Sequence, residues 1–226
     1  MAAEFQAERE ALVRTLRAEI SDERVLSAFR EVPRHRFVAP EMARHAYDDR
    51  PLPIGHGQTI SQPTMVAMMT QALRLTGEEK ALEVGTGSGY QAAILSRLVR
   101  EVISVERIPK LAGQAERVLR ELGYDNVRVY VAGETLGRPE DAPYDAIVVT
   151  AGAREVPSSL IDQLAMNGRL AVPVGGRKLQ QLVRATKTDR GVTLERLGEC
   201  RFVPLIAPEE GWPEWEVSTN GRRPAG

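Results

Sequence analysis

The sequence contains one cysteine, no apolar run as long as 18 residues and almost no net charge, and each of these absences excludes a class of protein. A single cysteine, Cys200, excludes a framework of intrachain disulfides. A membrane-spanning helix needs about 18 or more apolar residues in succession. The 30 basic and 31 acidic side chains give a net charge of −1, so no field of one sign favours nucleic acid as the partner. We therefore expect neither a nucleic-acid partner nor a membrane.

The scarce cysteine and histidine residues also bear on compartment and chemistry. The first residues, MAAEFQAERE, are acidic and lack the apolar core of a secretory signal peptide. A lone cysteine fits a reducing compartment, so we expect a cytoplasmic protein. Cys200 lies in a strand-like stretch and is interpreted as a small core or edge residue. His35, His45 and His56 lack the spacing of metal ligands, so the sequence predicts no metal site.

Short apolar runs alternate with helical patterns from about residue 80 onward. The expected strands are 80–84, 101–105, 126–131, 144–150 and 169–174, and the expected helices are 91–99, 109–122 and 158–164. Such alternation predicts a parallel sheet covered by helices on both faces. Two longer strands, 180–187 and 192–204, flank an Asp-Arg-Gly turn and predict a C-terminal hairpin.

The residues before this alternation divide into helices and a long loop. Apolar residues at near-helical spacing predict a helix over 3–20, and the polar pair at 21–22 predicts the cap of a second helix that ends before Pro33. Five prolines and two glycines make 33–63 mostly loop, and a loop of this length in a compact protein is usually functional. Pro63 predicts the first turn of the next helix.

The most informative segment is ALEVGTGSGY at 81–90, where a strand runs into a glycine turn that opens a helix. Glycine permits positive φ and close approach of a ligand to the backbone, and the helix start offers free N–H groups. Glu106 closes the next strand, 21 residues after Gly85. A ribose-binding acid belongs at this position in a Rossmann-like nucleotide site. The spacing therefore predicts a nucleotide-like ligand.

The chemistry around the turn favours one ligand over another. A dinucleotide fingerprint has a third glycine where Tyr90 stands, so a nicotinamide cofactor is the weaker interpretation. Glu83 precedes the turn, and an acid beside open backbone N–H groups can satisfy a group that carries both an ammonium and a carboxylate. The pattern resembles the glycine motif of class I methyltransferases that use S-adenosyl-L-methionine (AdoMet).

Further segments carry a more specific pattern. They are VPRHRFV at 32–38, AYDD at 46–49, LPIG at 52–55, QTISQP at 58–63, APYDAI at 142–147, residues 157–164, GRL at 168–170, PVG at 173–175 and FVPL at 202–205. Together, over roughly residues 20–216, they resemble the protein-L-isoaspartate O-methyltransferase family.

The resemblance implies an α/β fold, with a Rossmann-like class I methyltransferase sheet, helices on both faces, an N-terminal helical cap and a C-terminal β-hairpin. We expect a single methyltransferase domain over 1–226 and a monomer. Its expected parts are a helical cap and substrate loop at 1–75, an AdoMet-binding core with the hairpin at 76–206, and an irregular tail at 207–226. Trp212 and Trp215 are expected to close the C-terminal segment over the sheet.

The resemblance also implies a reaction. The family transfers the methyl group of AdoMet to the free α-carboxyl of L-isoaspartyl residues in damaged proteins and peptides, leaving S-adenosyl-L-homocysteine. The ester closes to a succinimide that reopens partly to normal aspartate, so the expected role is protein repair. A carboxylate with a pKa near 4 is already ionised at neutral pH, so no strong base is needed. Alignment of the reacting atoms can supply roughly 7–11 kcal/mol.

Residues are assigned to the site through the same resemblance. Ser61 matches the family's active-site serine, and we expect its hydroxyl to orient the substrate carboxylate, although its local sequence also fits a helix cap. The expected cofactor-binding residues are Thr59, Ile60, Glu83, Gly85, Thr86, Gly87, Ser88, Glu106, Arg107, Gly133 and Glu134. The expected substrate-binding residues are Ile54, Gly55, His56, Gln58 and Val203. Arg34 and Arg36 can attract a peptide carboxylate, but we interpret them as exposed structural arginines.

One departure from the family leaves alternatives open. The family usually has Gly-Asp-Gly where this chain has AGE at 132–134, so the carboxylate is missing at Gly133 and Glu134 stands one place late. The alternatives are a methyltransferase with another acceptor, a nicotinamide oxidoreductase, and a protein that binds AdoMet without catalysis. The pattern at 52–63 argues against the first. Tyr90 and the lack of a proton-relay motif argue against the second.

Overall fold

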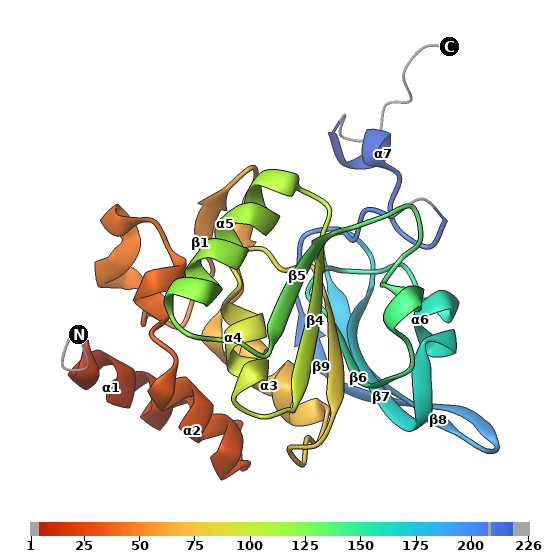
Figure 1. The fold of residues 1–226 in the computed structure, drawn as a ribbon, viewed down its shortest axis with the longest axis horizontal. Coiled ribbons are helices and arrows are strands. Elements are labelled where there is room, and N and C mark those ends of the chain that lie inside the picture. Colours follow the sequence, from red (N-terminus) through yellow and green to blue (C-terminus); the bar gives the residue numbers. More distant parts are fainter. Residues whose placement is uncertain (1–4, 208, 219–226) are drawn as a thin grey trace.

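The computed structural model describes residues 5–207 and 209–218, and a seven-stranded sheet forms its centre (Figure 1). The strands are β3 (Lys80–Val84), β4 (Glu101–Glu106), β5 (Val127–Val131), β6 (Tyr144–Val149), β7 (Leu164–Gly175), β8 (Gln180–Thr188) and β9 (Gly191–Cys200). Their spatial order is β5-β4-β3-β6-β7-β8-β9. Strands β3 to β7 are parallel, whereas β8 and β9 pair antiparallel as a hairpin. The predicted class I methyltransferase sheet with its C-terminal hairpin is confirmed.

The direction of the chain across the sheet changes at β3. From β3 the chain moves outward to β4 and β5, and it then returns to place β6 on the other side of β3. Open α/β sheets bind ligands outside the carboxyl ends of their strands at such a switch point. A ligand site is therefore expected at the loops that follow β3, β4 and β6.

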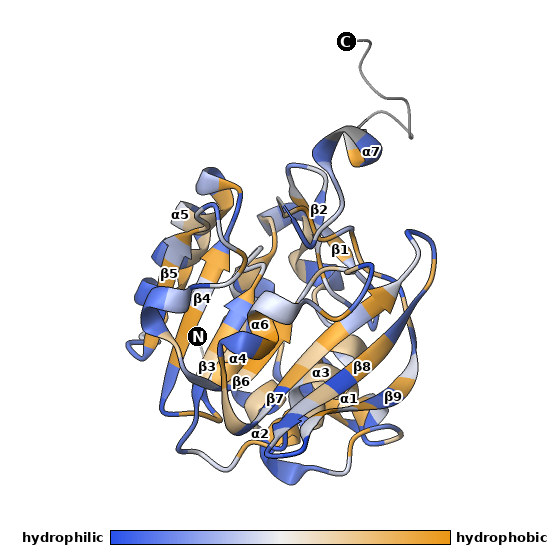
Figure 2. Cartoon of the chain, turned by 90° about the vertical axis from the view of Figure 1, so that its right-hand side faces the viewer, coloured by the Kyte–Doolittle hydropathy of each residue, from blue (hydrophilic) through white to orange (hydrophobic). Residues whose placement is uncertain are grey.

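Helices cover both faces of the sheet because its strands are apolar on both sides. Alternate side chains point to opposite faces, so Ala81 and Val102 join one apolar cluster while Leu82 and Ile103 join the other. The first face carries α3 (Pro63–Ala72), α4 (Tyr90–Ser96) and α5 (Pro109–Glu121); the second carries α6 (Ser158–Asp162) through Leu160. Figure 2 shows the apolar residues concentrated along the central strands.

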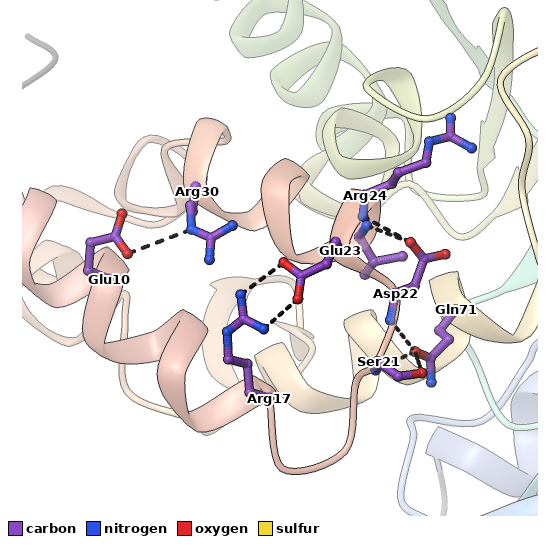
Figure 3. Close-up of polar contacts among 9 residues, drawn as sticks. Glu10, Arg17, Ser21, Asp22, Glu23, Arg24, Arg30 and Gln71 are labelled. Carbon is purple, nitrogen blue, oxygen red and sulfur yellow. Dashed lines mark hydrogen bonds and ion pairs between the residues drawn. The ribbon is translucent and has the colours of Figure 1, made fainter.

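The N-terminal cap, α1 (Gln6–Leu16) and α2 (Glu23–Glu31), packs beside α3 on the first face. Its helices are joined by polar contacts (Figure 3): Asp22 accepts hydrogen bonds from two backbone amides of α2, and Gln71 of α3 accepts from the Asp22 amide. Arg17 pairs with Glu23 across the turn. The helix α1 is shorter than predicted because its hydrogen bonds tighten to an i→i−3 pattern after Leu16, where the Ala18 amide donates to the Thr15 carbonyl and the Glu19 amide to the Leu16 carbonyl. Residues 1–4 lie outside the described part.

The segment predicted as loop at 33–63 contains short regular elements. These are the 3-10 helices η1 (Arg34–Phe37) and η2 (Pro40–His45) and a separate hairpin of β1 (Leu52–Gly55) and β2 (Gln58–Ile60). Gly55, His56 and Gly57 turn the hairpin with positive φ angles of 87°, 53° and 69°. Strands of three or four residues are too short for a recognisable alternation, which explains why the pattern predicted only loop. Pro63 occupies the first turn of α3, as predicted.

The C-terminal boundaries also differ from the prediction. Strand β7 begins at Leu164 rather than at 169, β9 ends at Cys200 rather than at 204, and a helix, α7 (Glu214–Ser218), lies in the tail expected to be irregular. Cys200 is buried at the end of β9, as interpreted. No helix in residues 5–207 and 209–218 has both the length and the apolar character needed to cross a membrane.

Candidate functional site

A cavity of about 530 Å³ opens at the carboxyl ends of β3, β4, β5 and β6, at the switch point of the sheet. Its walls come from the loops after these strands, from β2 and the start of α3, and from the chain after β9. The volume falls within the range typical of small-molecule sites.

The glycine loop forms the floor of this cavity, and its backbone is tied to the sheet. Gly85, Gly87 and Gly89 have positive φ angles of 101°, 52° and 88°. The Gly85 amide donates to the Val105 carbonyl at 2.8 Å, and Thr150 Oγ1 donates to the Gly85 carbonyl at 2.6 Å. A Cβ on Gly85 would lie 2.3 Å from Thr150 Oγ1, so the approach of β6 to the loop requires glycine here.

Glu106 is fixed beside the loop at the end of β4. Its Oε2 accepts from the Gly87 amide at 2.9 Å and its Oε1 from the Ile108 amide at 2.9 Å. Each carboxylate oxygen retains a further acceptor site, which suits the hydroxyls of a ribose. Arg107 follows at the cavity rim and forms an ion pair with Glu214 of α7 at 3.2 Å.

Glu83 lies at the end of β3 with no exposed surface. Its Oε2 accepts from Ser104 Oγ at 2.5 Å, while its Oε1 has no hydrogen-bond partner in the described part of the chain. Burial raises the pKa of Glu83 to about 8; the nearby Glu106 charge also raises it, and the Ser104 hydrogen bond opposes both. A buried carboxyl with an unpartnered oxygen at a cavity wall suits a cationic donor such as an ammonium.

Ser61 lies on the opposite wall, between β2 and α3. The N-cap of α3 is Gln62, and Asp49 Oδ1 accepts from the Thr64 amide at 2.9 Å, so Ser61 is not the helix cap. Its carbonyl accepts a hydrogen bond from Arg34 Nη2 at 2.8 Å. Arg34 is fully buried, so the interpretation of this arginine as exposed is wrong, whereas the Arg36 side chain is 39% exposed.

The structure brings most of the expected site residues to this cavity. Those that line it are Gln58, Thr59, Ile60, Ser61, Glu83, Gly85, Thr86, Gly87, Ser88, Glu106, Arg107, Gly133 and Val203. Ile54, Gly55, His56 and Glu134 are not among the lining residues. Ile54 Cδ1 approaches Gly87 from above, Gly55 and His56 form the exposed β1–β2 turn, and Glu134 points to solvent beyond Gly133.

Sequence reasoning missed several lining residues because it searched for acids and glycines. The missed residues that matter most are Ile108, Ala132, Thr150, Ala151, Trp212 and Glu214. The first four lie at or just after the carboxyl ends of predicted parallel strands: Thr150 ends one, Ala132 and Ala151 directly follow two, and Ile108 comes three residues after another. That position is itself a usable signal, because the carboxyl ends of such strands meet at one edge.

The C-terminal segment closes one side of the cavity. The Trp212 Nε1 donates to the Gly152 carbonyl at 3.0 Å, and the Gly152 amide donates to the Val203 carbonyl at 2.7 Å. The guanidinium of Arg154 lies 4.4 Å from the centre of the Trp212 ring. Trp212 therefore closes this segment over the carboxyl edge of the sheet, while the side chain of Trp215 lies outside the described residues.

A family model supplies the decisive comparison. The model of the protein-L-isoaspartate(D-aspartate) O-methyltransferase family matches residues 7–210. The chain belongs to this family. It is 52% identical to protein-L-isoaspartate O-methyltransferase 1 of Syntrophobacter fumaroxidans, over 92% of this chain and 98% of the relative. It is also 52% identical to the protein-L-isoaspartate O-methyltransferase of Methanoculleus marisnigri, over 93% and 96% of the two chains.

Solved structures agree with this membership. A protein-L-isoaspartate O-methyltransferase structure aligns with a TM-score of 0.77 at 32% identity over 86% of this chain, which spans 65% of that longer chain. A Plasmodium falciparum chain described as a protein-L-isoaspartate O-methyltransferase, in complex with S-adenosyl-L-homocysteine, aligns with a TM-score of 0.74 at 27% identity. That alignment covers 86% of this chain and 96% of the Plasmodium chain.

The segment at 132–134, which departs from the expected family pattern, borders the cavity through its backbone. The Ala132 amide donates to the Glu106 carbonyl at 2.8 Å, and Gly133 lines the cavity without a side chain. Neither residue offers a carboxylate at the position where the family usually has one. Among the described residues, no three His, Cys, Asp or Glu side chains are arranged to hold a metal ion.

Proposed function

We propose that this protein transfers the methyl group of AdoMet to the free α-carboxyl of L-isoaspartyl residues in damaged proteins and peptides, starting their repair through a succinimide. The observation that carries the proposal is the meeting of two walls in one cavity: the glycine loop with Glu83 and Glu106, and the opposite wall with Ser61. Family membership over residues 7–210 supports the same reaction.

The residues present fit AdoMet. The unpartnered Oε1 of Glu83 suits its ammonium group, and the carboxylate of Glu106 suits its ribose hydroxyls. AdoMet supplies a methyl group on a positively charged sulfur, which is a good leaving group. S-adenosyl-L-homocysteine is the expected product.

The chain's own task is positioning. A substrate carboxyl with a pKa near 4 is ionised at neutral pH, so no residue has to remove a proton from it. The Ser61 hydroxyl donates to one carboxylate oxygen and turns the other toward the methyl group. The apolar walls exclude water, and alignment of this kind is worth roughly 7–11 kcal/mol in well-oriented reactions.

The test is methyl transfer from labelled AdoMet to a peptide that contains one L-isoaspartate, with the L-aspartate peptide as control. We expect a base-labile ester on the isoaspartyl peptide alone. Label on neither peptide, with AdoMet binding intact, would contradict the proposal and favour an AdoMet-binding protein without this catalysis.

A Ser61→Ala variant tests the role of the hydroxyl. We expect kcat to fall about 10- to 100-fold, because loss of alignment at a reacting group costs rates of this order, while AdoMet affinity is retained. Ser96→Ala is the matched control, since the Ser96 hydroxyl donates to the Ala93 carbonyl within α4 and is not among the residues that line the cavity. Equal rates for the two variants would refute the role of Ser61.

We further propose that the chain acts as one domain and as a monomer in the cytoplasm. One copy of the chain supplies both the glycine loop and the Ser61 segment of the cavity, which supports a site within a single copy. The buried, unpaired Cys200 is consistent with a reducing compartment. Sedimentation of the active protein tests the monomer.

A further inference from the structure

Arg34 contacts one residue from each wall of the cavity, Ser61 and Tyr90. It is fully buried, and it is the largest fully buried residue in the part of the chain that the structure describes. Its Nε donates to the Ala46 carbonyl at 2.8 Å and its Nη2 donates to the Ser61 carbonyl at 2.8 Å. Its guanidinium also lies 4.7 Å from the centre of the Tyr90 ring, at the start of α4. One planar group thus touches the 33–46 segment, the Ser61 loop and the helix that follows the glycine loop.

The burial of this charge is costly. Burial lowers the pKa of Arg34, and the neighbouring Tyr90 and Asp49 only partly oppose that effect. Within residues 5–207 and 209–218, Nη1 has no hydrogen-bond partner and no carboxylate forms an ion pair with the guanidinium. Apolar side chains of similar volume commonly fill such a space at equal or lower free energy. An apolar side chain could fill this space, but it could not donate to the Ala46 and Ser61 carbonyls as the guanidinium does.

The two walls differ in how they are held. The glycine loop is bound to the main sheet by the Gly85 amide and by Thr150. Ser61 instead follows β2, which pairs only with β1 in a two-stranded sheet apart from the main one. The carbonyl of Ser61 thus lies outside the main sheet and is fixed by Arg34.

Asp49 holds the residues on the other side of Ser61. Its carboxylate accepts from the Gln62 side chain at 3.0 Å, from the Thr64 amide at 2.9 Å and from Thr64 Oγ1 at 2.7 Å. These contacts fix the start of α3 but leave the Ser61 carbonyl without a contact to Asp49. That is the group that Arg34 binds.

We propose that Arg34 is a positioning residue for methyl transfer: it fixes the main chain of Ser61 and thereby the place of the Ser61 hydroxyl relative to the glycine loop. The proposal rests on the proposed function, because it concerns how the same site aligns its substrate.

The test compares Arg34→Met and Arg34→Lys with the unmodified protein, and Arg36→Met is the matched control. Arg36 is a neighbouring, partly exposed arginine whose closest acidic partner is Glu121 at 3.7 Å. We expect Arg34→Met to lower kcat/KM for the isoaspartyl peptide about 10- to 100-fold, since misplacement by about 1 Å can cost that much. The Kd for AdoMet should change less than about threefold, because the glycine loop has its own anchors. Lysine keeps the charge but cannot bind both carbonyls in a fixed fork, so about a fivefold or larger loss is expected.

A double-mutant cycle separates positioning from a general structural role. In a Ser61→Ala background the hydroxyl is already absent, so Arg34→Met should lower kcat/KM less than about threefold further. Equal losses in the two backgrounds would overturn the proposal, and so would a folded variant within about twofold of the unmodified rate. If Arg34→Met does not unfold cooperatively, the losses of kcat/KM are instead compared for Arg34→Lys, in the unmodified protein and in the Ser61→Ala variant. The unmodified protein is assayed first. If it transfers no methyl group, both the proposed function and this inference are wrong.

Discussion

Glu83 should make the protein less stable as the pH rises, and its replacement by glutamine should remove this effect. The carboxyl is fully buried and its pKa is raised from 4.5 to about 8, chiefly by burial. The folded state therefore holds a proton that the unfolded chain releases above pH 4.5. Where the folded state binds more protons, stability falls as pH rises. This loss runs from about pH 4.5 to about pH 8 and is complete above that pH.

The magnitude follows from the shift. Each pKa unit corresponds to about 1.36 kcal/mol, so between pH 4.5 and pH 7 the unmodified protein loses about 3 kcal/mol that Glu83→Gln does not lose. For a chain of this length, about 3 kcal/mol corresponds to a difference in Tm of roughly 6–12 °C. The same substitution removes the carboxylate that the AdoMet ammonium would bind. A hydrogen bond to a charged group is worth about 1.5–3 kcal/mol, but a Glu83 carboxyl with a pKa of about 8 must first lose its proton at pH 7, which costs about 1.4 kcal/mol. At pH 7, AdoMet should therefore bind more weakly to Glu83→Gln by roughly fourfold, and by at most about 15-fold.

The assay is thermal and denaturant unfolding of both proteins at several pH values, with calorimetric titration of AdoMet at pH 7. Glu79→Gln is the control, because Glu79 precedes the same strand with the opposite shift. Burial alone would raise the pKa of Glu79, but hydrogen bonds from Gly77 and Thr76 outweigh burial and lower it. Its ionised form stabilises the fold at neutral pH, and that contribution is lost as pH falls through its folded pKa.

The two variants should therefore diverge in opposite directions from the unmodified protein as the pH rises. Curves for Glu83→Gln that run parallel to those of the unmodified protein from pH 4.5 to pH 8 would refute the reasoning. So would a Glu83→Gln variant that gains stability at neutral pH yet binds AdoMet as tightly as before, because its carboxylate would then have no role toward the ammonium.

Two further substitutions test the cavity walls. Gly85→Ala should destabilise the protein by about 1–3 kcal/mol through backbone strain at positive φ, with a steric clash against Thr150 in addition, and should abolish AdoMet binding. Gly113→Ala, on the exposed face of α5 with open space around it, should instead stabilise by about 1 kcal/mol; chemical denaturation distinguishes the two signs. Trp212→Phe keeps a ring at the cavity but loses the bond to Gly152, so AdoMet should bind about fivefold more weakly in a titration. Unchanged affinity would show that the C-terminal segment does not support the cofactor site.

Patterns in the sequence predict the sheet and the cofactor side of the site. Alternating apolar runs and helices predicted β3 to β6 to within a residue at each end, because strands buried on both faces must be apolar throughout, whereas β7 begins five residues earlier than predicted. Glu83, the glycine loop and Glu106 could be found together because parallel strands end at one edge, so local positions along the chain become neighbours in space. The family resemblance added Ser61, whose local sequence alone left a helix cap equally open.

The wall that contains Ser61 could be recognised only in the folded protein. The short strands β1 and β2 gave no periodic signal, and Arg34 in a proline-rich loop was interpreted as exposed although it is fully buried beneath Ser61. Trp212 and Glu214 reach the cavity from a tail with no regular pattern. These placements depend on contacts between segments far apart in the chain, and a periodic pattern reports only which face of its own element is buried. The burial of a charged side chain is fixed by the carbonyls that surround it, and those come together only in the folded protein.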